Sequence, residues 1–436
     1  MTHRVPEGHR DLSVDALARV EGEGAMRVRI SDDRVTEVRL DIYEPPRFFE
    51  AFLEGREMGE PVDITARICG ICPIAYQLSA CNAIEDACGV TVDGPLRDLR
   101  RLIYCGEWIE SHALHIYLLH APDFLHYESA IDMAADHQDV VEMGLRLRKA
   151  GNELITLLGG RESHPINLRL GGFYRVPTER ELSRIRPLLE RGVEESAATV
   201  RLVAGFDFPD LTLDHELLAL REPGKYPIDQ GRVASTGGLD FPVQAWPDHV
   251  AEEHVEHSTA LHARLAGREG PYMVGPLARY ALAAHELTPY AAEVAREVGL
   301  ETGERNPYRS IVVRSVEMLY AYEEALRLID GYTEPDRPAI PVPPRAGVGH
   351  GATEAPRGIL YHRYEIDDDG RIVNATITPP TSQNQRAVEA DLATFVEAHI
   401  DLDDAMLQWR CEQAIRNYDP CISCSTHFLD LTVERE

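Results

Sequence analysis

Four cysteines in two Cys-x-x-Cys pairs are the residues in this sequence best suited to metal chemistry. Cys69 and Cys72 lie in the first quarter of the chain, whereas Cys421 and Cys424 lie close to its C-terminal end. Thiolates bind zinc, iron and other soft or borderline metals, so two such pairs could complete one site. Pro73 suits the first position of a helix, which would place Cys72 at a helix N-terminus where the dipole favours a thiolate.

The wide separation of the two pairs leaves several kinds of site open. Four thiolates suit tetrahedral zinc, but zinc ribbons usually place their two pairs roughly 15–20 residues apart. A redox metal buried between two ends of a large domain fits the separation, and the pairs could also be unrelated. A thioredoxin-like dithiol is disfavoured because it requires a single pair.

Composition narrows the class of protein that holds these cysteines. The chain has 436 residues and a formal net charge of −29, which disfavours a nucleic-acid binder because phosphates require basic patches. No apolar run approaches the roughly 18 residues that cross a bilayer, and the first residues lack the apolar core of a secretory signal. We therefore expect a cytoplasmic protein without a membrane span. Four further cysteines are expected to be core residues: Cys81, Cys88, Cys105 and Cys411.

The elements that must position the cysteines are predominantly helical. Alternating apolar and charged residues predict β-hairpins at 26–42 and 359–377, and Asp369-Gly370 is a typical turn in the second. The proline-rich stretch 333–351 is expected to be an extended connection. We predict an α+β fold, mainly helical, with a helix-bundle core and small sheets. Helical periodicity predicts helices at 73–88, 96–120, 134–158, 178–204, 247–267, 307–331, 384–399 and 404–416.

The residues around the two pairs carry a family resemblance. Arg-Ile-Cys-Gly-Ile-Cys-Pro at 67–73 and Asp-Pro-Cys-Ile-Ser-Cys-Ser-Thr-His at 419–427 closely resemble the two signature motifs of the large subunit of nickel–iron hydrogenases. The segment 274–279, Val-Gly-Pro-Leu-Ala-Arg, looks most like the cytoplasmic, multimeric, NAD(P)-linked (sulfhydrogenase-type) subgroup. Further motifs in the family's order lie at 19–24, 46–50, 160–165 and 355–358.

The resemblance implies a nickel–iron centre held by the four cysteines. By motif position, Cys69 and Cys421 would be terminal nickel ligands, and Cys72 and Cys424 would bridge nickel to iron. In the family the iron also carries one carbon monoxide and two cyanides. Soft thiolates suit both metals, and the buried anionic cluster that results needs polar partners.

The partners implied by the resemblance come from two segments. Arg357, preceded by Pro356, would contact a cyanide and face the open metal position. Thr381 resembles the hydroxyl that hydrogen-bonds the other cyanide, with Ser382 as the alternative. Without the motif, Arg357 would be interpreted as a surface arginine in a salt bridge.

Two carboxylates are candidates for catalysis. Glu21 matches the family's proton-relay glutamate, and a partly buried glutamate can have its pKa raised toward neutrality. Asp419 matches a residue near the open coordination site, although Asp-Pro also favours a turn. Without the motifs, Glu21 would be interpreted as a solvated charge and Asp419 as a turn residue.

Three positions depart from the pattern of many relatives. Glu23 and Tyr76 each stand where a histidine is common, and Ser111 stands where some relatives carry a second active-site aspartate. Tyr76 is expected to alter the hydrogen bond to a bridging sulfur, and Ser111 to thin the outer acidic network.

A second metal site and a removable tail are also implied. Glu50 and His427 match residues that bind magnesium, iron or another divalent ion in the family, and a carboxylate suits a hard cation that keeps several waters. A maturation endopeptidase removes the peptide after the matching histidine, so residues 428–436 are predicted to be such a tail.

Together these features predict the catalytic subunit of a hydrogenase that performs H2 ⇌ 2 H⁺ + 2 e⁻. The expected partners are an iron–sulfur small subunit and flavin- and NAD(P)-binding electron-transfer subunits, because the chain has no further cysteine cluster. The alternatives are a non-catalytic relative resembling a complex I subunit and a zinc-stabilised assembly protein. A site built from both ends of the chain favours one domain over 1–427.

Overall fold

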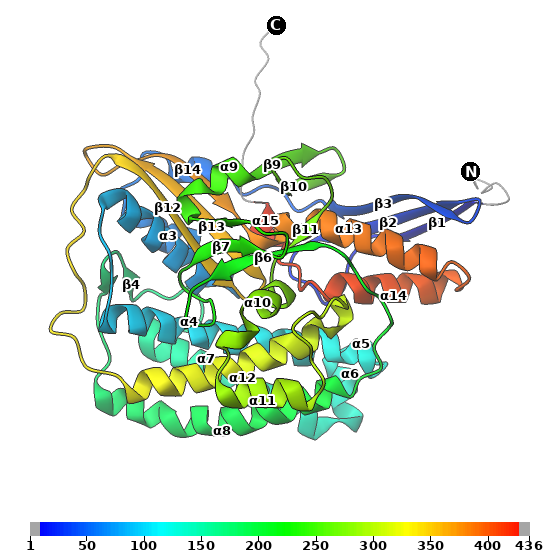
Figure 1. Cartoon of the computed structure of the whole chain (residues 1–436), viewed down its shortest axis with the longest axis horizontal. Helices are drawn as coiled ribbons and strands as arrows, with labels where there is room; N and C mark the ends of the chain where they lie inside the picture. Colours follow the sequence, from blue (N-terminus) through cyan, green and yellow to red (C-terminus); the bar gives the residue numbers. More distant parts are fainter. Residues whose placement is uncertain (1–8, 427–436) are drawn as a thin grey trace, which may run out of the picture.

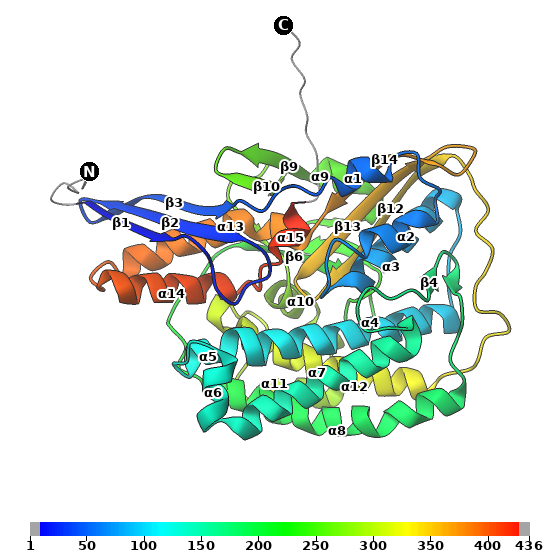
Figure 2. The ribbon, with the colours of Figure 1, turned by 180° about the vertical axis from the view of Figure 1, so that it is seen from behind.

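The computed structural model describes residues 9–426 and has an α+β architecture. Figures 1 and 2 show long, nearly parallel helices on one side of the molecule and the sheets on the other. The longest helices are α3 (Pro73–Cys88), α4 (Pro95–Leu114), α7 (Gln138–Gly159), α8 (Glu179–Ala204), α12 (Ser310–Asp330), α13 (Pro380–Ala398) and α14 (Asp404–Arg416). In the described residues, no helix combines the length and the apolar character needed to cross a membrane.

The helical layer is organised around α12. Apolar residues lie on every side of this helix, and Ile311, Val316 and Leu319 are completely buried. A helix that is apolar all round must be covered by other elements, and α12 packs between α4 and α8. Helix α8 begins with a capping box, in which Thr178 and Glu181 satisfy each other's backbone N–H groups.

The sheets are small and mostly antiparallel. The first has the order β1-β2-β3, formed by His9–Val14, Gly24–Ser31 and Arg34–Ile42. The second, β12-β13-β14, is formed by Gly347–Ala355, Gly358–Ile366 and Ile372–Thr378. The third has the order β11-β6-β7-β8, and the remaining pairs are β9-β10 and β4-β5. Their bounds are Leu168–Arg169 (β4), Gly172–Phe173 (β5), Glu216–Arg221 (β6), Arg232–Ser235 (β7), Asp240–Phe241 (β8), Val250–Val255 (β9), Ser258–Leu265 (β10) and Tyr272–Met273 (β11).

Short helices complete the chain between these elements. They are α1 (Phe49–Leu53), α2 (Glu60–Thr65), the π-helical η1 (His115–His120), α5 (Ala121–Phe124), α6 (Ala130–Asp136), η2 (Val243–Ala245), α9 (Trp246–His249), α10 (Pro276–Ala283), η3 (Ala284–Glu286), α11 (Pro289–Glu297), η4 (Pro307–Arg309) and α15 (Ile422–Ser425). The predicted helix at 96–120 therefore ends as a π-helical segment that continues α4.

Three predicted elements need correction. The segment 247–267 was expected to be a helix, but after the short α9 it forms the β9-β10 hairpin. Its Ala, Glu and Leu content favours a helix locally, whereas packing of β10 against α13 and β3 favours a strand. The stretch 333–351 becomes strand β12 from Gly347, so the predicted hairpin at 359–377 is part of a three-stranded sheet. The helix predicted from 384 begins at Pro380, which places Thr381 and Ser382 in its first turn.

Candidate metal centre

The four predicted ligand cysteines converge in one buried place. Cys69 Sγ lies 3.3 Å from Cys421 Sγ, and Cys72 Sγ lies 3.8 Å from Cys424 Sγ. The Sγ atoms of Cys421 and Cys424 are 2.7 Å apart. All four side chains are buried, so the two ends of the chain form a single four-cysteine group suited to metal binding.

Each pair is held at the start of a helix. Cys69 Sγ accepts hydrogen bonds from the backbone N–H groups of Ile71 and Cys72, and α3 then begins at Pro73, as predicted. Cys421 immediately precedes α15, which contains Cys424. The backbone therefore aims four sulfurs inward from two tight turns rather than from flexible loops.

An N-terminal segment closes over the second pair. Glu21 forms a parallel backbone bridge with Cys421, and Ile422 N–H donates to the Glu21 carbonyl at 2.9 Å. Gly22 has a φ of +89°, and a Cβ placed there would lie 2.6 Å from Ile422 Cβ. Only glycine permits this approach without strain, so the Arg-Val-Glu-Gly motif is explained by the contact it makes.

The electrostatics of the cysteines favour a bound cation. Four thiolates cannot share a buried site without a cation to compensate their charge. Hydrogen bonds, first from the Cys421 thiol, lower the pKa of Cys69 well below its ordinary value. Burial raises the pKa of the Cys421 thiol well above its ordinary value. Divalent metals of soft or borderline character would satisfy the whole donor set.

Arg357 and Asp419 form a buried ion pair beside the cysteines. Arg357 lies in the turn between β12 and β13, where Nε donates to the Asp419 carbonyl at 2.7 Å and Nη2 to Oδ1 at 3.1 Å. Burial lowers the pKa of Arg357, but Asp419 and the thiolates of the site raise it well above its ordinary value. Arg357 Nη1 and Asp419 Oδ2 are buried without a hydrogen-bond partner in the described residues. Both atoms are therefore available to a bound group.

Glu21 contacts the metal site directly. Its Oε2 lies 3.1 Å from Cys421 Sγ and accepts a hydrogen bond of 3.1 Å from Ser423 N–H. Burial raises the pKa of the Glu21 carboxyl, and the negative charge of Cys69 raises it further. The carboxyl is therefore placed to exchange a proton with a ligand sulfur.

The other predicted contacts of the centre also lie at buried positions. Thr381 Oγ1 accepts a hydrogen bond of 3.1 Å from Cys421 N–H, which joins the first turn of α13 to the second pair. Ser382 Oγ is buried and has no partner among residues 9–426. The Pro356 carbonyl accepts a hydrogen bond of 2.9 Å from Arg279, so Pro356 is held in the same turn as Arg357.

The predicted second metal site is described only in part. Glu50 lies at the start of α1, half-buried, and its Oε1 accepts a hydrogen bond of 2.6 Å from Ile377 N–H. His427 and the predicted tail 428–436 lie outside the described residues.

Comparison with known proteins places these residues in a family. The family model described as nickel-dependent hydrogenase matches residues 47–151 and 268–427, more than half of the chain. The chain belongs to the nickel-dependent hydrogenase family. It is 34% identical to sulfhydrogenase 1 subunit alpha of Pyrococcus furiosus, over 96% of this chain and 98% of that protein.

Two further similarities are to NAD-linked hydrogenases. The chain is 27% identical to the NAD-reducing hydrogenase HoxS subunit beta of Cupriavidus necator, over 96% of this chain and 95% of that protein. The crystal structure of an NAD⁺-reducing [NiFe]-hydrogenase in the H2-reduced state superimposes with a TM-score of 0.87 at 27% identity, covering 97% of this chain and 100% of that chain.

The family decides among the interpretations that cysteine spacing left open. This chain is the large, catalytic subunit of a nickel–iron hydrogenase. The four-cysteine group is its nickel–iron site. The zinc-stabilised and non-catalytic alternatives are therefore set aside.

Sequence reasoning missed the residue that holds the arginine turn. Arg279, on α10, is fully buried and donates to the carbonyls of Ala355 and Pro356, each at 2.9 Å. Its guanidinium also pairs with Glu317 at 2.7 Å and Glu354 at 3.0 Å. The Arg279 side chain thus fixes the backbone of Ala355 and Pro356, which immediately precede Arg357. The only signal in the sequence was that Arg279 closes the Val-Gly-Pro-Leu-Ala-Arg segment.

We expect Arg279→Met to destabilise the protein by about 3–5 kcal/mol, because it leaves the buried Glu317 carboxylate without the cation that compensates its charge. Arg279 holds the pKa of Glu317 down to about 2 against the effect of burial, so this carboxylate is charged at neutral pH. The measurement is the thermal midpoint of the purified protein. Arg232→Met, which removes an exposed pair with Asp240, is the control and should cost less than about 1 kcal/mol. Equal losses in the two variants would contradict the buried-charge argument.

Two other supporting residues also escaped prediction. Arg47 Nη2 donates to the Ile68 carbonyl at 2.6 Å and contacts the Ser423 carbonyl, so one side chain joins the segments that carry the two pairs. Glu107, buried on α4, accepts from the N–H group of Ile74 at 2.6 Å and caps the helix that follows Cys72.

The departures at Tyr76 and Ser111 both prove to be buried. The Tyr76 side chain is almost completely buried. Its pKa is raised well above the ordinary value by burial and by the thiolates of Cys424 and Cys72, which places the ring beside the predicted bridging sulfurs. Ser111 Oγ is likewise buried and has no partner within 9–426.

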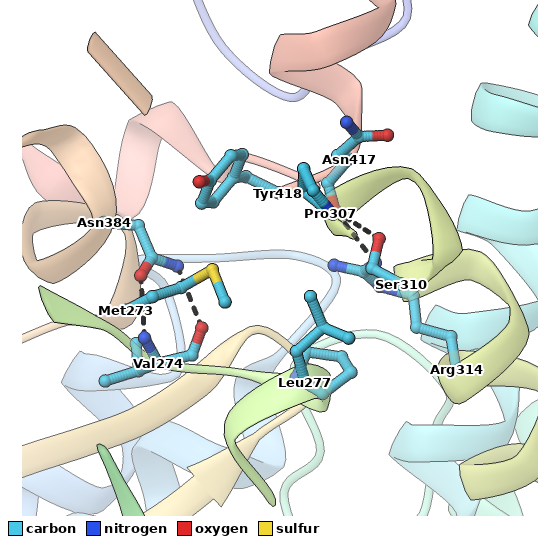
Figure 3. A pocket seen from close by; sticks show the side chains of 10 residues that line it. Met273, Val274, Leu277, Pro307, Ser310, Arg314, Asn384, Asn417 and Tyr418 are labelled. Carbon is cyan, nitrogen blue, oxygen red and sulfur yellow. Dashed lines mark hydrogen bonds between the residues drawn. The ribbon is translucent and has the colours of Figure 1, made fainter. Parts of the chain in front are cut away.

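A small pocket lies between α10, α12, α13 and the segment that leads to Asp419. Figure 3 shows Ser310 and Arg314 of α12 reaching the backbone of Asn417, whose carbonyl accepts hydrogen bonds of 2.9 Å from both. Burial lowers the pKa of Arg314 to about 10, although the Asp419 carboxylate opposes this effect. None of the four ligand cysteines lines this pocket, so it supports the segment leading to Asp419.

Proposed function

We propose that this hydrogenase subunit performs H2 ⇌ 2 H⁺ + 2 e⁻ and that its electrons pass through an iron–sulfur small subunit to NAD(P). The observation that carries the proposal is the junction of Cys421 Sγ and Glu21 Oε2, 3.1 Å apart, at the edge of four buried thiols. A base in contact with a ligand sulfur is what heterolytic splitting of dihydrogen requires.

The roles of the cysteines follow from their places in the two motifs. Cys69 and Cys421 would be terminal nickel ligands, and Cys72 and Cys424 would bridge to iron. The bound nickel–iron pair supplies the electrophilic position at which dihydrogen is polarised and the redox capacity for two electrons. The four thiols lie close together and are buried, which supports this arrangement.

The surroundings suit an iron that carries one carbon monoxide and two cyanides. Within the described residues, Arg357 keeps Nη1 unpartnered beside the thiols, and Ser382 keeps Oγ unpartnered in the first turn of α13. Both groups are donors suited to the nitrogen of a cyanide. Thr381 can donate its hydroxyl proton while its oxygen accepts from Cys421 N–H. Pro356 shapes the turn, and Asp419 keeps Arg357 oriented.

Proton movement is assigned to Cys421 and Glu21. The sulfur holds the proton first and passes it to Glu21 Oε2, whose pKa is raised by burial. Ser423 N–H fixes the carboxyl through the same oxygen, so the carboxyl stays within reach of the sulfur.

Electron transfer requires another polypeptide. The cysteines of residues 9–426 outside the four-cysteine group are buried singly and form no second cluster. The relatives are named as subunits of sulfhydrogenases and NAD-reducing hydrogenases, which supports an iron–sulfur small subunit followed by flavin- and NAD(P)-binding subunits. A cytoplasmic location fits that coupling.

The remaining proposals concern a second metal ion, the C-terminal tail and the domain organisation. We infer that Glu50 and His427 hold a magnesium or ferrous ion, that an endopeptidase removes 428–436, and that 1–427 forms one domain. The half-buried Glu50 carboxylate, held by Ile377 N–H at the end of β14, supports the first inference.

The test is metal analysis and infrared spectroscopy of the complex purified under anaerobic conditions. We expect one nickel per chain and absorption bands of metal-bound carbon monoxide and cyanide. Hydrogen should reduce a viologen dye through this subunit and NAD(P)⁺ only when the partner subunits are present. Stoichiometric zinc without nickel, or nickel without hydrogen-dependent dye reduction, would contradict the proposal.

A further inference from the structure

A second group of metal-ligating side chains lies where the β9-β10 hairpin meets α13. His257 is in the hairpin turn, His262 is on β10, and Glu389 is on α13. One ring nitrogen of each histidine and one carboxylate oxygen lie within 4.8 Å of one another. Figures 1 and 2 both show β10 beside α13. The three side chains therefore face one point from two separate stretches of chain, the hairpin and α13.

His262 is the member whose environment demands a partner. It is 2% exposed, and its Nε2 is buried with no hydrogen-bond partner in the described residues. Burial, together with the positive charges of His257 and Arg386, lowers the pKa of His262 to about 4. The ring is therefore neutral at pH 7, which is the form that ligates a metal.

Glu389 and His257 are already oriented toward the same point. Glu389 Oε1 lies 2.8 Å from His257 Nε2 and accepts a hydrogen bond of 2.9 Å from Leu40 N–H. Both side chains are 18% exposed, so an ion can enter from solvent. The Asp41 carboxylate adds a second negative charge near Glu389. This charge offsets the positive charge of Arg386 near His262.

We propose that His257, His262 and Glu389 form a divalent transition-metal site, with zinc as the best-suited ion. Two imidazoles and one carboxylate are a common three-residue set for zinc, which leaves the fourth position to water. Zinc would replace the proton shared between His257 and Glu389 and would satisfy the unpartnered nitrogen of His262.

The site is separate from the nickel–iron centre but mechanically connected to it. Glu389 lies eight residues after Thr381 on α13, roughly 12 Å along the helix axis. Thr259 in the same hairpin donates to the carbonyls of Ile42 and Glu44 at 2.9 and 2.8 Å. An ion here would therefore clamp the hairpin to α13 and the end of β3, the elements that flank the cysteines.

The test is zinc retention by the mature, nickel-loaded complex prepared without a polyhistidine tag. The complex is stripped with a chelator, dialysed against zinc chloride and analysed for metal. We expect Glu389→Gln and His257→Gln to retain one zinc per chain fewer than the unmodified protein, with the nickel content unchanged. Glu389→Gln preserves an oxygen for Leu40 N–H, so the local fold is kept. Glu397→Gln, at an exposed position of the same helix, is the matched control and should retain the full zinc content.

A thermal measurement and a spectroscopic probe complete the test. Zinc should raise the thermal midpoint of the unmodified protein and of Glu397→Gln, but not that of Glu389→Gln. Cobalt(II) should show the intense visible bands of a tetrahedral site only where His257 and Glu389 are present. Equal zinc content in all variants, or a zinc-induced stabilisation that survives Glu389→Gln, would overturn the proposal whether or not the hydrogenase reaction is confirmed.

Discussion

Cys424→Ser should empty the nickel–iron site and abolish hydrogen-dependent electron transfer. The Cys424 sulfur lies 2.7 Å from that of Cys421 and 3.8 Å from that of Cys72, so it is part of the donor set. A serine hydroxyl is a hard donor with a high pKa, so it supplies neither the charge nor the polarisable lone pairs of a thiolate. The loss should exceed the roughly 10–100-fold effect that follows removal of a residue behind a ligand.

Nickel per chain and dye reduction by hydrogen are the two measurements for this variant. Cys411→Ser is the control, because Cys411 is fully buried on α14 but belongs to no ligand group among the described residues. We expect Cys411→Ser to lower stability modestly and to keep its nickel. Nickel at full occupancy in Cys424→Ser, with activity unchanged, would show that the four-cysteine group is not the site.

The sequence predicted the residues of this site better than it predicted their supports. The cysteines, Glu21 and Arg357 carry their identity in short motifs, and the structure places them together. Helix α3 was predicted correctly because it begins with proline after a tight turn and continues as an apolar helix. Arg279 had no such signal, since its function depends on carboxylates that folding brings from other elements.

The main error in the predicted fold, the helix expected at 247–267, also arises from contacts between distant parts of the sequence. The residues of β9 and β10 have good helix propensity, and only their pairing and their contacts with α13 and β3 make them strands. Tertiary contacts that lie far apart in the sequence cannot be obtained from local periodicity. The same hairpin carries His257 and His262, so the incorrect helix also concealed the cluster with Glu389.

Glu21→Gln should slow catalysis by about 100–10,000-fold while leaving nickel and iron bound, because a general acid–base group typically contributes that much. The amide oxygen can still accept the hydrogen bond from Ser423 N–H, and the backbone bridge to Cys421 does not involve the side chain. What the variant loses is a group that can take a proton from the Cys421 sulfur. The measurements are turnover and hydrogen–deuterium exchange, together with metal content and the infrared spectrum.

The pKa of Glu21 separates this catalytic effect from a folding effect. Burial and the negative charge of Cys69 raise the pKa of the folded carboxyl above that of the unfolded chain. The native state therefore holds the Glu21 proton more tightly than the unfolded chain does. As the pH rises from the pKa of the unfolded carboxyl through that of the folded one, this contribution to the free energy of unfolding is lost. Removing the charge should leave Glu21→Gln at least as stable at neutral pH as the unmodified protein.

The matched control for Glu21→Gln is Glu23→Gln, two residues later and exposed. It removes the same charge from the same segment but makes no contact with a ligand sulfur in the described part of the chain, so turnover should stay near that of the unmodified protein. Full turnover in Glu21→Gln would assign proton transfer to another group. An equal decrease in both variants would indicate a general effect of charge. A large loss confined to Glu21→Gln, with the metals retained, is the result that the 3.1 Å contact with Cys421 requires.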